Sequence, residues 1–151
     1  MLLAYRLPRE PSSPRIALWR KLRRLGAGQV LDGLVALPLD ARNREQFEWL
    51  AQEVVEAGGE ASVWLAELAA ASYGRALVAA MWAQVAAEYE RVIADAAAAA
   101  AAAPGQRKRT LGRLRRELRR VRARDYFNAV ERETAQQAVE SLAILVEEPV
   151  R

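Results

Sequence analysis

The chain has 151 residues, the length of one ordinary domain or of a domain with a helical extension. Its composition, 52% hydrophobic and 28% charged, is sufficient to bury a core and keep the surface polar. It contains no cysteine and no histidine, which excludes thiol nucleophiles, disulfides, histidine acid–base chemistry and almost all zinc sites. Only a metal site built from carboxylates and water would remain.

The N-terminal part begins with a predicted strand and helix. An apolar run over 2–7, ended by a proline, predicts a buried strand. Ser13 is a favoured N-cap residue and Pro14 suits the first helical position. We therefore expect a helix over about 14–25 that stops at Gly26.

A hairpin, a second helix and a fourth strand follow. Residues 29–31 and 34–37 flank an Asp-Gly dipeptide, which is typical of tight hairpin turns. A helix is predicted over 41–57, and alternating apolar residues over 61–66 predict the fourth strand. The order β-α-β-β-α-β predicts a ferredoxin-like α+β domain over 1–68, an antiparallel sheet with two helices on one face.

The remainder, 69–151, is predicted to be a helical extension that packs as a hairpin or bundle. Apolar residues at helical spacing predict a long helix that continues through an alanine run until Pro104-Gly105 breaks it. An arginine-rich helix follows, and a last helix is expected directly after Asp125. The apolar seam of the arginine-rich helix consists of Leu111, Leu114, Leu118 and Val121.

Catalytic chemistry is poorly supported by the sequence. Its serines have no histidine to activate them, and the carboxylates of the helix over 41–57 are spaced like a solvent-facing surface. We therefore expect a binding protein rather than an enzyme, with no cofactor and no metal site. The tryptophans are interpreted as core residues rather than a base-stacking platform; they are Trp19, Trp49, Trp64 and Trp82.

The net charge of +4 conceals a strong segregation of charge along the chain. Residues 1–25 carry +6 and residues 26–104 carry −7. Residues 105–124 carry +9, and residues 125–151 carry −4. Two basic blocks in a folded chain favour either an anionic partner or pairing with the acidic blocks.

DNA is the anionic partner that the arginine-rich segment fits best. Arginine binds phosphate bidentately, and a helix about 27 Å long can follow a phosphate backbone or enter a major groove. The alternatives are pairing with acidic residues of neighbouring helices, or an anionic membrane surface, which the narrow seam without an interfacial aromatic disfavours. The residues predicted to contact DNA are Arg20, Lys21, Arg23, Arg24, Arg107, Lys108, Arg109, Arg113, Arg116 and Arg120. The acidic residues considered as intramolecular partners are Glu88, Glu90, Asp95, Glu131 and Glu133.

A second, smaller anion site is predicted at the start of the first helix. Ser13 and Arg15 lie in its first turn, where backbone N–H groups and a guanidinium can bind a small tetrahedral anion. The alternative is that Arg15 pairs with Glu10 or with a carboxylate of the sheet.

Several blocks of sequence, in order, resemble the N-terminal domain of the chromate resistance protein ChrB. They begin with Tyr5-Arg6-Leu7-Pro8-Arg9-Glu10-Pro11-Ser12-Ser13-Pro14-Arg15, Trp19-Arg20-Lys21-Leu22 and Leu25-Gly26-Ala27, and continue with Asp32-Gly33, Leu37-Pro38, Glu48-Trp49-Leu50, Gly58-Gly59-Glu60-Ala61 and Arg124-Asp125-Tyr126-Phe127. The early blocks are also similar to the ferredoxin-like domain of the PaaX repressor group.

The resemblance implies a cytoplasmic, chromate-responsive transcriptional regulator that binds DNA and acts on an operon with a chromate efflux transporter. Arg15, Trp19, Arg20 and residues 124–127 are the family-like positions. We expect a homodimer without a membrane-spanning segment. The alternatives are an oxyanion sensor or accessory protein that does not bind DNA, and a structural dimerisation module.

Overall fold

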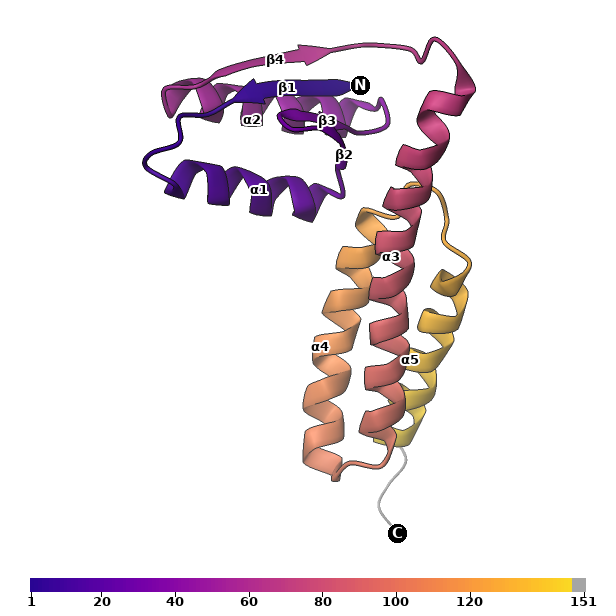
Figure 1. The fold of residues 1–151 in the computed structure, drawn as a ribbon. Coiled ribbons are helices and arrows are strands. Elements are labelled where there is room, and N and C mark those ends of the chain that lie inside the picture. Colours follow the sequence, from indigo (N-terminus) through magenta and orange to yellow (C-terminus); the bar gives the residue numbers. More distant parts are fainter. Residues whose placement is uncertain (148–151) are drawn as a thin grey trace. The chain divides into compact units, whose positions relative to one another are not determined.

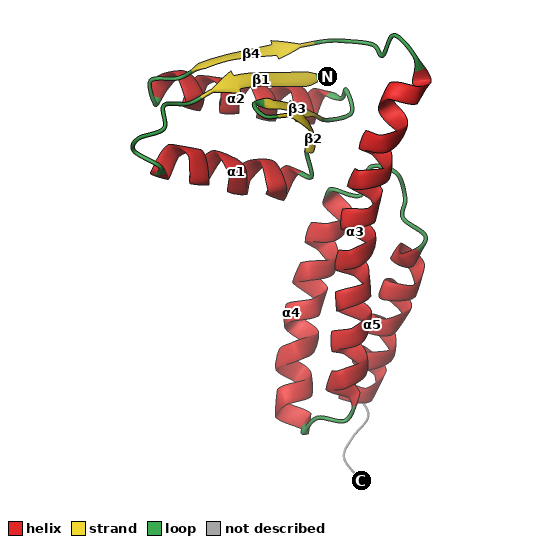
Figure 2. Ribbon diagram, in the orientation of Figure 1, coloured by secondary structure: helices red, strands yellow, loops and turns green. Residues whose placement is uncertain are grey.

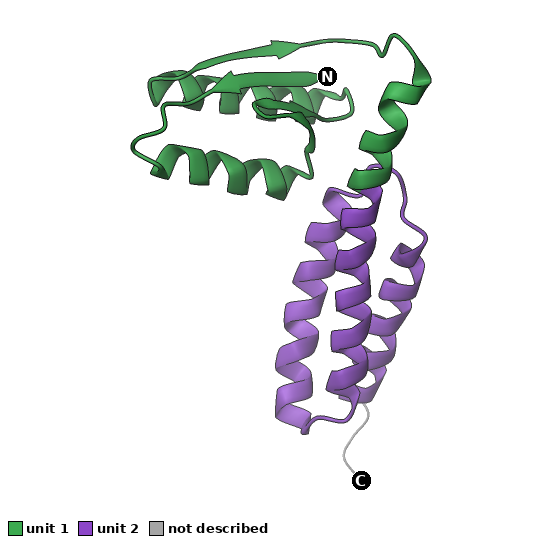
Figure 3. Cartoon of the chain, viewed as in Figure 1, with its two compact units in different colours: residues 1–81 green, residues 82–151 purple. Residues whose placement is uncertain are grey.

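The computed structural model describes residues 1–147, so the last four residues of the predicted extension 69–151 lie outside the described residues. The chain divides into two compact units, Met1–Met81 and a second unit that begins at Trp82 (Figure 3). In chain order the elements are β1 (Leu2–Arg6), α1 (Ser13–Leu25), β2 (Gly28–Leu31), β3 (Leu34–Ala36), α2 (Ala41–Glu56), β4 (Glu60–Trp64), α3 (Ala71–Ala100), α4 (Pro104–Ala123) and α5 (Glu131–Glu147) (Figure 1). The predicted α+β class and the predicted order of elements are confirmed.

The first unit is an antiparallel sheet with two helices on one face (Figure 2). The strand order is β2-β3-β1-β4, so β3 separates β1 from β2 and β1 separates β3 from β4. Leu3 of β1 lies in register between Val35 of β3 and Val63 of β4, and these side chains share one face of the sheet. That face and the apolar sides of α1 and α2, which include Leu18 and Phe47, supply the buried core.

The ends of the two helices follow from local signals. Gly26, at φ 74°, ends α1 in the left-handed conformation that glycine adopts without steric cost. Asp40 caps α2, because its side chain accepts a hydrogen bond of 2.7 Å from the backbone N–H of Asn43. The prediction for Ser13 is wrong: Ser12 is the N-cap residue of α1, without a side-chain capping bond, and Ser13 is the first helical residue.

The predicted domain boundary at 68 precedes α3, whereas the compact units divide within that helix. The first turns of α3 pack on the sheet, because a Cβ added to Gly28 would lie 2.7 Å from Leu77 and 2.6 Å from the Met81 sulfur. These residues therefore belong to the first unit, although they form the start of a helix that continues into the second.

The second unit is a three-helix bundle formed by the rest of α3 with α4 and α5. Its core combines the apolar faces of the three helices, and the alanines of α3 at 96 and 99 are buried within it. Tyr89 is completely buried and donates a hydrogen bond of 3.0 Å to Asp125 Oδ2. Burial, together with this hydrogen bond to a carboxylate, raises the pKa of Tyr89 well above its ordinary value.

Several predicted boundaries need correction. The long helix ends at Ala100, and Pro104 starts the next helix rather than breaking the first, since proline suits a first helical position. The last helix begins at Glu131, not directly after Asp125, because Asn128 at φ 51° interrupts the helical backbone. The fourth strand ends at Trp64 and leaves residues 65–66 outside the sheet.

The interpretation of the tryptophans as core residues is wrong for three of the four. Trp19, Trp49 and Trp64 are between 56% and 58% exposed, and Trp82 packs partly buried against the bundle core. The spacing of a tryptophan on an apolar helix face predicts its side of the helix but not how far its large ring extends beyond the neighbouring elements.

Candidate nucleic-acid interface and anion groove

The α4 helix is fixed in the bundle by its predicted apolar seam. Leu111, Leu114, Leu118 and Val121 are all buried, with exposed fractions of 5% or less. At about 100° per residue, the direction opposite this seam falls at Arg116, with Arg109 and Arg120 within about 40° of it. We call these three residues the outer arginine face.

Other arginines of the segment are engaged by the bundle itself. Arg107 spans the α3–α4 junction and donates hydrogen bonds of 3.0–3.2 Å to the carbonyls of residues 100, 102 and 145. Arg124 forms an ion pair with Glu88, which is only 7% exposed. Arg107, which was predicted to contact DNA, therefore has a structural role, since its guanidinium satisfies carbonyls that the end of α3 leaves unpaired.

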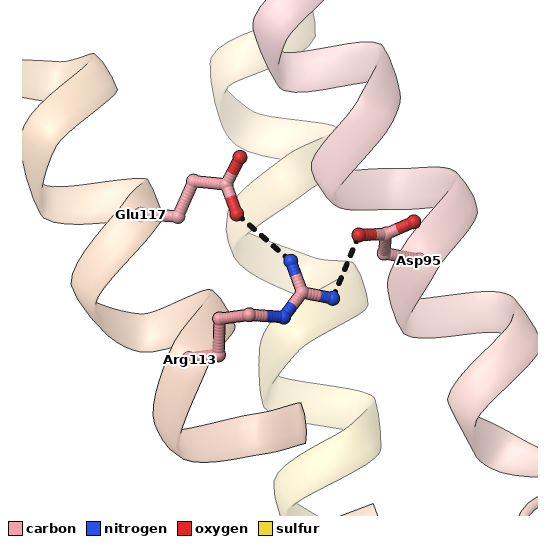
Figure 4. A network of polar contacts seen from close by, with 3 residues as sticks. All are labelled: Asp95, Arg113 and Glu117. Carbon is pink, nitrogen blue, oxygen red and sulfur yellow. Dashed lines mark hydrogen bonds and ion pairs between the residues drawn. The ribbon is translucent and has the colours of Figure 1, made fainter. Parts of the chain in front are cut away.

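Arg113 bridges two carboxylates on the flank of α4 that faces α3 (Figure 4). It lies 2.8 Å from Asp95 Oδ2 and 3.1 Å from Glu117 Oε2, and each of the three side chains is between 38% and 50% exposed. The hydrogen bond with Asp95 is the main cause that raises the pKa of Arg113. Of the acidic partners considered from the sequence, Glu88 and Asp95 form ion pairs with arginines of this segment.

The outer arginine face is exposed and has no ion pair within residues 1–147. Lys108, also predicted to contact DNA, is likewise exposed without a partner in that range.

Two further exposed arginines, Arg115 and Arg119, were not among the predicted contacts. With Arg122 they line a groove of about 420 Å³ between α4 and α5. Their position on the helical wheel between the seam and the outer face is the signal that could have identified them.

The basic residues of α1 have mixed environments. Lys21 forms an ion pair of 2.5 Å with Glu53 of α2, and the Arg23 guanidinium lies 5.1 Å from the centre of the Trp19 ring. Arg20 and Arg24 are exposed without ion pairs among the described residues.

A groove of about 910 Å³ lies within the first unit, between α1, β1 and the β2–β3 turn. Arg15, predicted as an anion ligand, lines it and pairs with no carboxylate in the described residues, Glu10 included. Ser13 does not line it, and its neighbour Ser12 does. The complete lining is Tyr5, Arg6, Leu7, Ser12, Arg15, Ile16, Trp19, Arg20, Gln29, Asp32 and Gly33.

The floor of the groove contains a tyrosine between charges of opposite sign. Burial, and then the negative charge of Asp32, raise the pKa of Tyr5, while the charge of Arg15 opposes them. The phenol therefore stays protonated and is a hydrogen-bond donor at neutral pH. Sequence reasoning missed Tyr5, Gln29 and Asp32, because only the folded sheet brings the hairpin turn opposite the first helix.

No helix within residues 1–147 is long and apolar enough to cross a lipid bilayer. In the same range, no three acidic side chains gather closely enough to hold a metal ion.

Comparison with known proteins identifies the family through one match. No curated protein and no solved structure matches the chain. A family model described as the N-terminal part of protein ChrB matches residues 15–104, which run from the first turn of α1 to the first residue of α4. The rest of α4, α5 and the predicted family-like positions at 124–127 lie outside the matched range. Since the match covers more than half of the sequence, the chain belongs to the ChrB N-terminal family of chromate resistance proteins.

Proposed function

We propose that this protein is a cytoplasmic, chromate-responsive transcriptional regulator that binds DNA through the outer arginine face of α4. Arg24 of α1 is proposed as an additional phosphate contact. The function is binding rather than catalysis, and the absence of cysteine and histidine from the sequence supports this. A homodimer would present two such arginine faces to two half-sites on the duplex.

The observation that carries the proposal is the unpaired state of Arg109, Arg116 and Arg120. Each is exposed, and none has an ion pair within the described residues. The buried seam on the opposite side of α4 holds the helix in place, so the three guanidinium groups project from a rigid support. Such a row of fixed positive charges releases counterions when it meets DNA phosphates.

The competing interpretation is that the arginines only hold the helices together. It accounts for arginines other than those of the outer arginine face. Arg107, Arg113 and Arg124 have partners from neighbouring helices or their connections. No such partner engages the outer arginine face in the described part of the chain. We therefore assign a structural role to Arg107, Arg113 and Arg124, and a DNA-binding role to the outer arginine face.

We also infer that the first unit is a ferredoxin-like domain. The support is its β-α-β-β-α-β order together with the separation of β1 from β2 by β3, which is the split arrangement of that class. The hairpin strands are short, at four and three residues, and the register shifts between Gln29 and Leu31.

The test is fluorescence anisotropy with duplex DNA from upstream of the protein's own coding sequence, over a range of salt concentrations. The variant replaces Arg109, Arg116 and Arg120 with Ala. If each arginine contacts one phosphate, the slope of log K against log salt should fall in magnitude by roughly 2 to 3. The matched control replaces Arg42, Arg75 and Arg91, three exposed arginines elsewhere, and should retain the slope.

Chromate is then added to the complex of the unmodified protein, where a regulator should show a change in DNA affinity. An unchanged salt slope in the outer-face variant would remove α4 as the interface. Absence of DNA binding at low salt would reject the proposal and favour an oxyanion-binding accessory protein or a structural module.

A further inference from the structure

The groove of the first unit is much larger than a bare oxyanion requires. Its volume of about 910 Å³ is at the upper end of the range for small-molecule sites, about 300–1,000 Å³. A tetrahedral oxyanion such as chromate would occupy a small part of that space and would touch few of the lining residues. The groove is also wholly within one compact unit, so its lining does not depend on the second unit.

One wall of the groove offers positive charge. Arg15 and Arg20, both on α1, line it and have no ion pair within the described residues. Arg6, from the adjacent strand, is balanced by Glu60 at 2.5 Å. Two free guanidinium groups on one wall suit a phosphate group, which arginine binds with paired hydrogen bonds.

The same wall offers an aromatic surface. Trp19 is 56% exposed and lines the groove between the two arginines in sequence, while Arg23 lies 5.1 Å from its ring centre. An exposed indole in a cationic groove is a stacking surface for a planar base, because every nucleobase has a π-face.

The opposite wall offers hydrogen-bond acceptors and a negative charge. Gln29 Nε2 donates a hydrogen bond of 3.3 Å to Asp32 Oδ1, which orients the carboxylate at the β2–β3 turn. A carboxylate repels a bare oxyanion but accepts hydrogen bonds from hydroxyl and amino groups. The ligand must therefore carry an anionic group and, at some distance from it, uncharged hydrogen-bond donors.

We propose that this groove binds a nucleoside phosphate, with its phosphate on Arg15 and Arg20, its base against Trp19 and its sugar or base donors on Asp32. Nucleoside phosphates combine the three required features: an anionic end, a planar aromatic ring and uncharged donors. The inference goes beyond DNA binding by α4, and its site lies on a different part of the chain.

The experiment titrates the full-length protein with AMP and follows tryptophan fluorescence and the heat of binding, with inorganic phosphate and chromate as separate arms. AMP should bind at least ten-fold more tightly than either inorganic anion. Trp19→Ala should weaken AMP binding by roughly 5- to 160-fold, the range expected for one stacked base, without weakening phosphate binding. Arg15→Ala should weaken the binding of AMP and phosphate alike.

The matched controls lie outside the groove. Trp49 is as exposed as Trp19, and Arg24 is an exposed arginine of the same helix, so Trp49→Ala and Arg24→Ala should leave AMP affinity within two-fold. Circular dichroism of each variant verifies the fold.

Two results would overturn the inference. If chromate or phosphate binds as tightly as AMP and Trp19→Ala changes nothing, the groove recognises a bare oxyanion. If AMP, GMP, CMP and UMP all fail to bind the folded protein, there is no nucleotide site. Either result leaves the DNA-binding test of the α4 variants unaffected.

Discussion

The flank and the outer face of α4 carry the same residue type and have different environments. On the flank and at the ends, Arg113 and Arg124 meet carboxylates of α3. On the outer face, Arg109, Arg116 and Arg120 meet none within the described residues. The difference teaches that arginine density does not define a binding surface. What defines it is whether a neighbouring element has already supplied a partner, so flank substitutions should act on stability and outer-face substitutions on DNA affinity.

The largest expected effect on the flank side of this comparison is that of Arg124→Ala. Glu88 is 7% exposed, so removal of its partner leaves a carboxylate buried without compensation. Breaking such a pair from one side costs about 3 to 5 kcal/mol, and we expect the free energy of unfolding to fall by about 3 kcal/mol because Arg124 is not fully buried. Urea denaturation followed by circular dichroism measures it.

The control for that prediction comes from the outer face of the same helix. Arg120→Ala removes an exposed side chain whose guanidinium has no ion pair in the described part of the chain, and should change the free energy of unfolding by less than about 0.5 kcal/mol. The double variant Arg124→Ala, Glu88→Gln should recover part of the loss, because the residual amide carries no charge. If Arg124→Ala and Arg120→Ala lowered the free energy of unfolding equally, the flank and the outer face of α4 would not differ in their contribution to stability.

A pH measurement tests how the end of α4 is anchored. Tyr89 of α3 donates to Asp125, and its pKa is raised in the folded state. Because the unfolded tyrosine ionises first, the stabilisation is fully present below a pH of about 10 and is lost as the pH rises above that value. The slope contributed by this one group is about 1.4 kcal/mol per pH unit.

The variant that isolates this contribution is Tyr89→Phe, studied by urea denaturation between pH 8 and about pH 11. At pH 8 it should lose about 1 kcal/mol for the missing hydrogen bond. As the pH rises above about 10, the difference between the two proteins should shrink, since only the unmodified protein has this tyrosine to titrate. A difference that stays constant over the whole range would show that Tyr89 ionises equally in both states.

The elements of the fold were predictable because their signals are local. The Asp-Gly turn, Pro14 and Gly26 specify a hairpin and the ends of a helix within a few residues, and the seam of α4 follows from the spacing of its leucines. The environment of each arginine was not predictable, since a partner such as Glu88 lies 36 residues away and becomes adjacent only after the helices pack. Arg107 was partly predictable, because at about 100° per residue it lies on the side of the leucine seam.

The groove was even less accessible to sequence reasoning than the paired arginines. Arg15 and Trp19 lie on one helix, whereas Tyr5 and Asp32 come from a strand and a turn that meet α1 only across the sheet. A tryptophan on an apolar helix face is usually core, and that expectation concealed the exposed ring of Trp19. Sequence spacing shows which residues share one face of a single element, whereas the groove is formed by α1, β1 and the β2–β3 turn together.

The smallest expected loss of stability on the flank side of this comparison is that of Arg113→Ala. Its two ion pairs are roughly half exposed, so water screens them, and such pairs contribute about 0.2 to 1 kcal/mol each at most. We expect a loss of about 0.5 kcal/mol that shrinks at high salt, because exposed charges are screened within about 3 Å at 1 M ionic strength. DNA affinity should retain its salt slope, since a guanidinium already held by Asp95 and Glu117 has few free donors for a phosphate. If Arg113→Ala and Arg116→Ala reduced the salt slope of DNA affinity equally, Arg113 would belong to the outer arginine face rather than to the flank of α4.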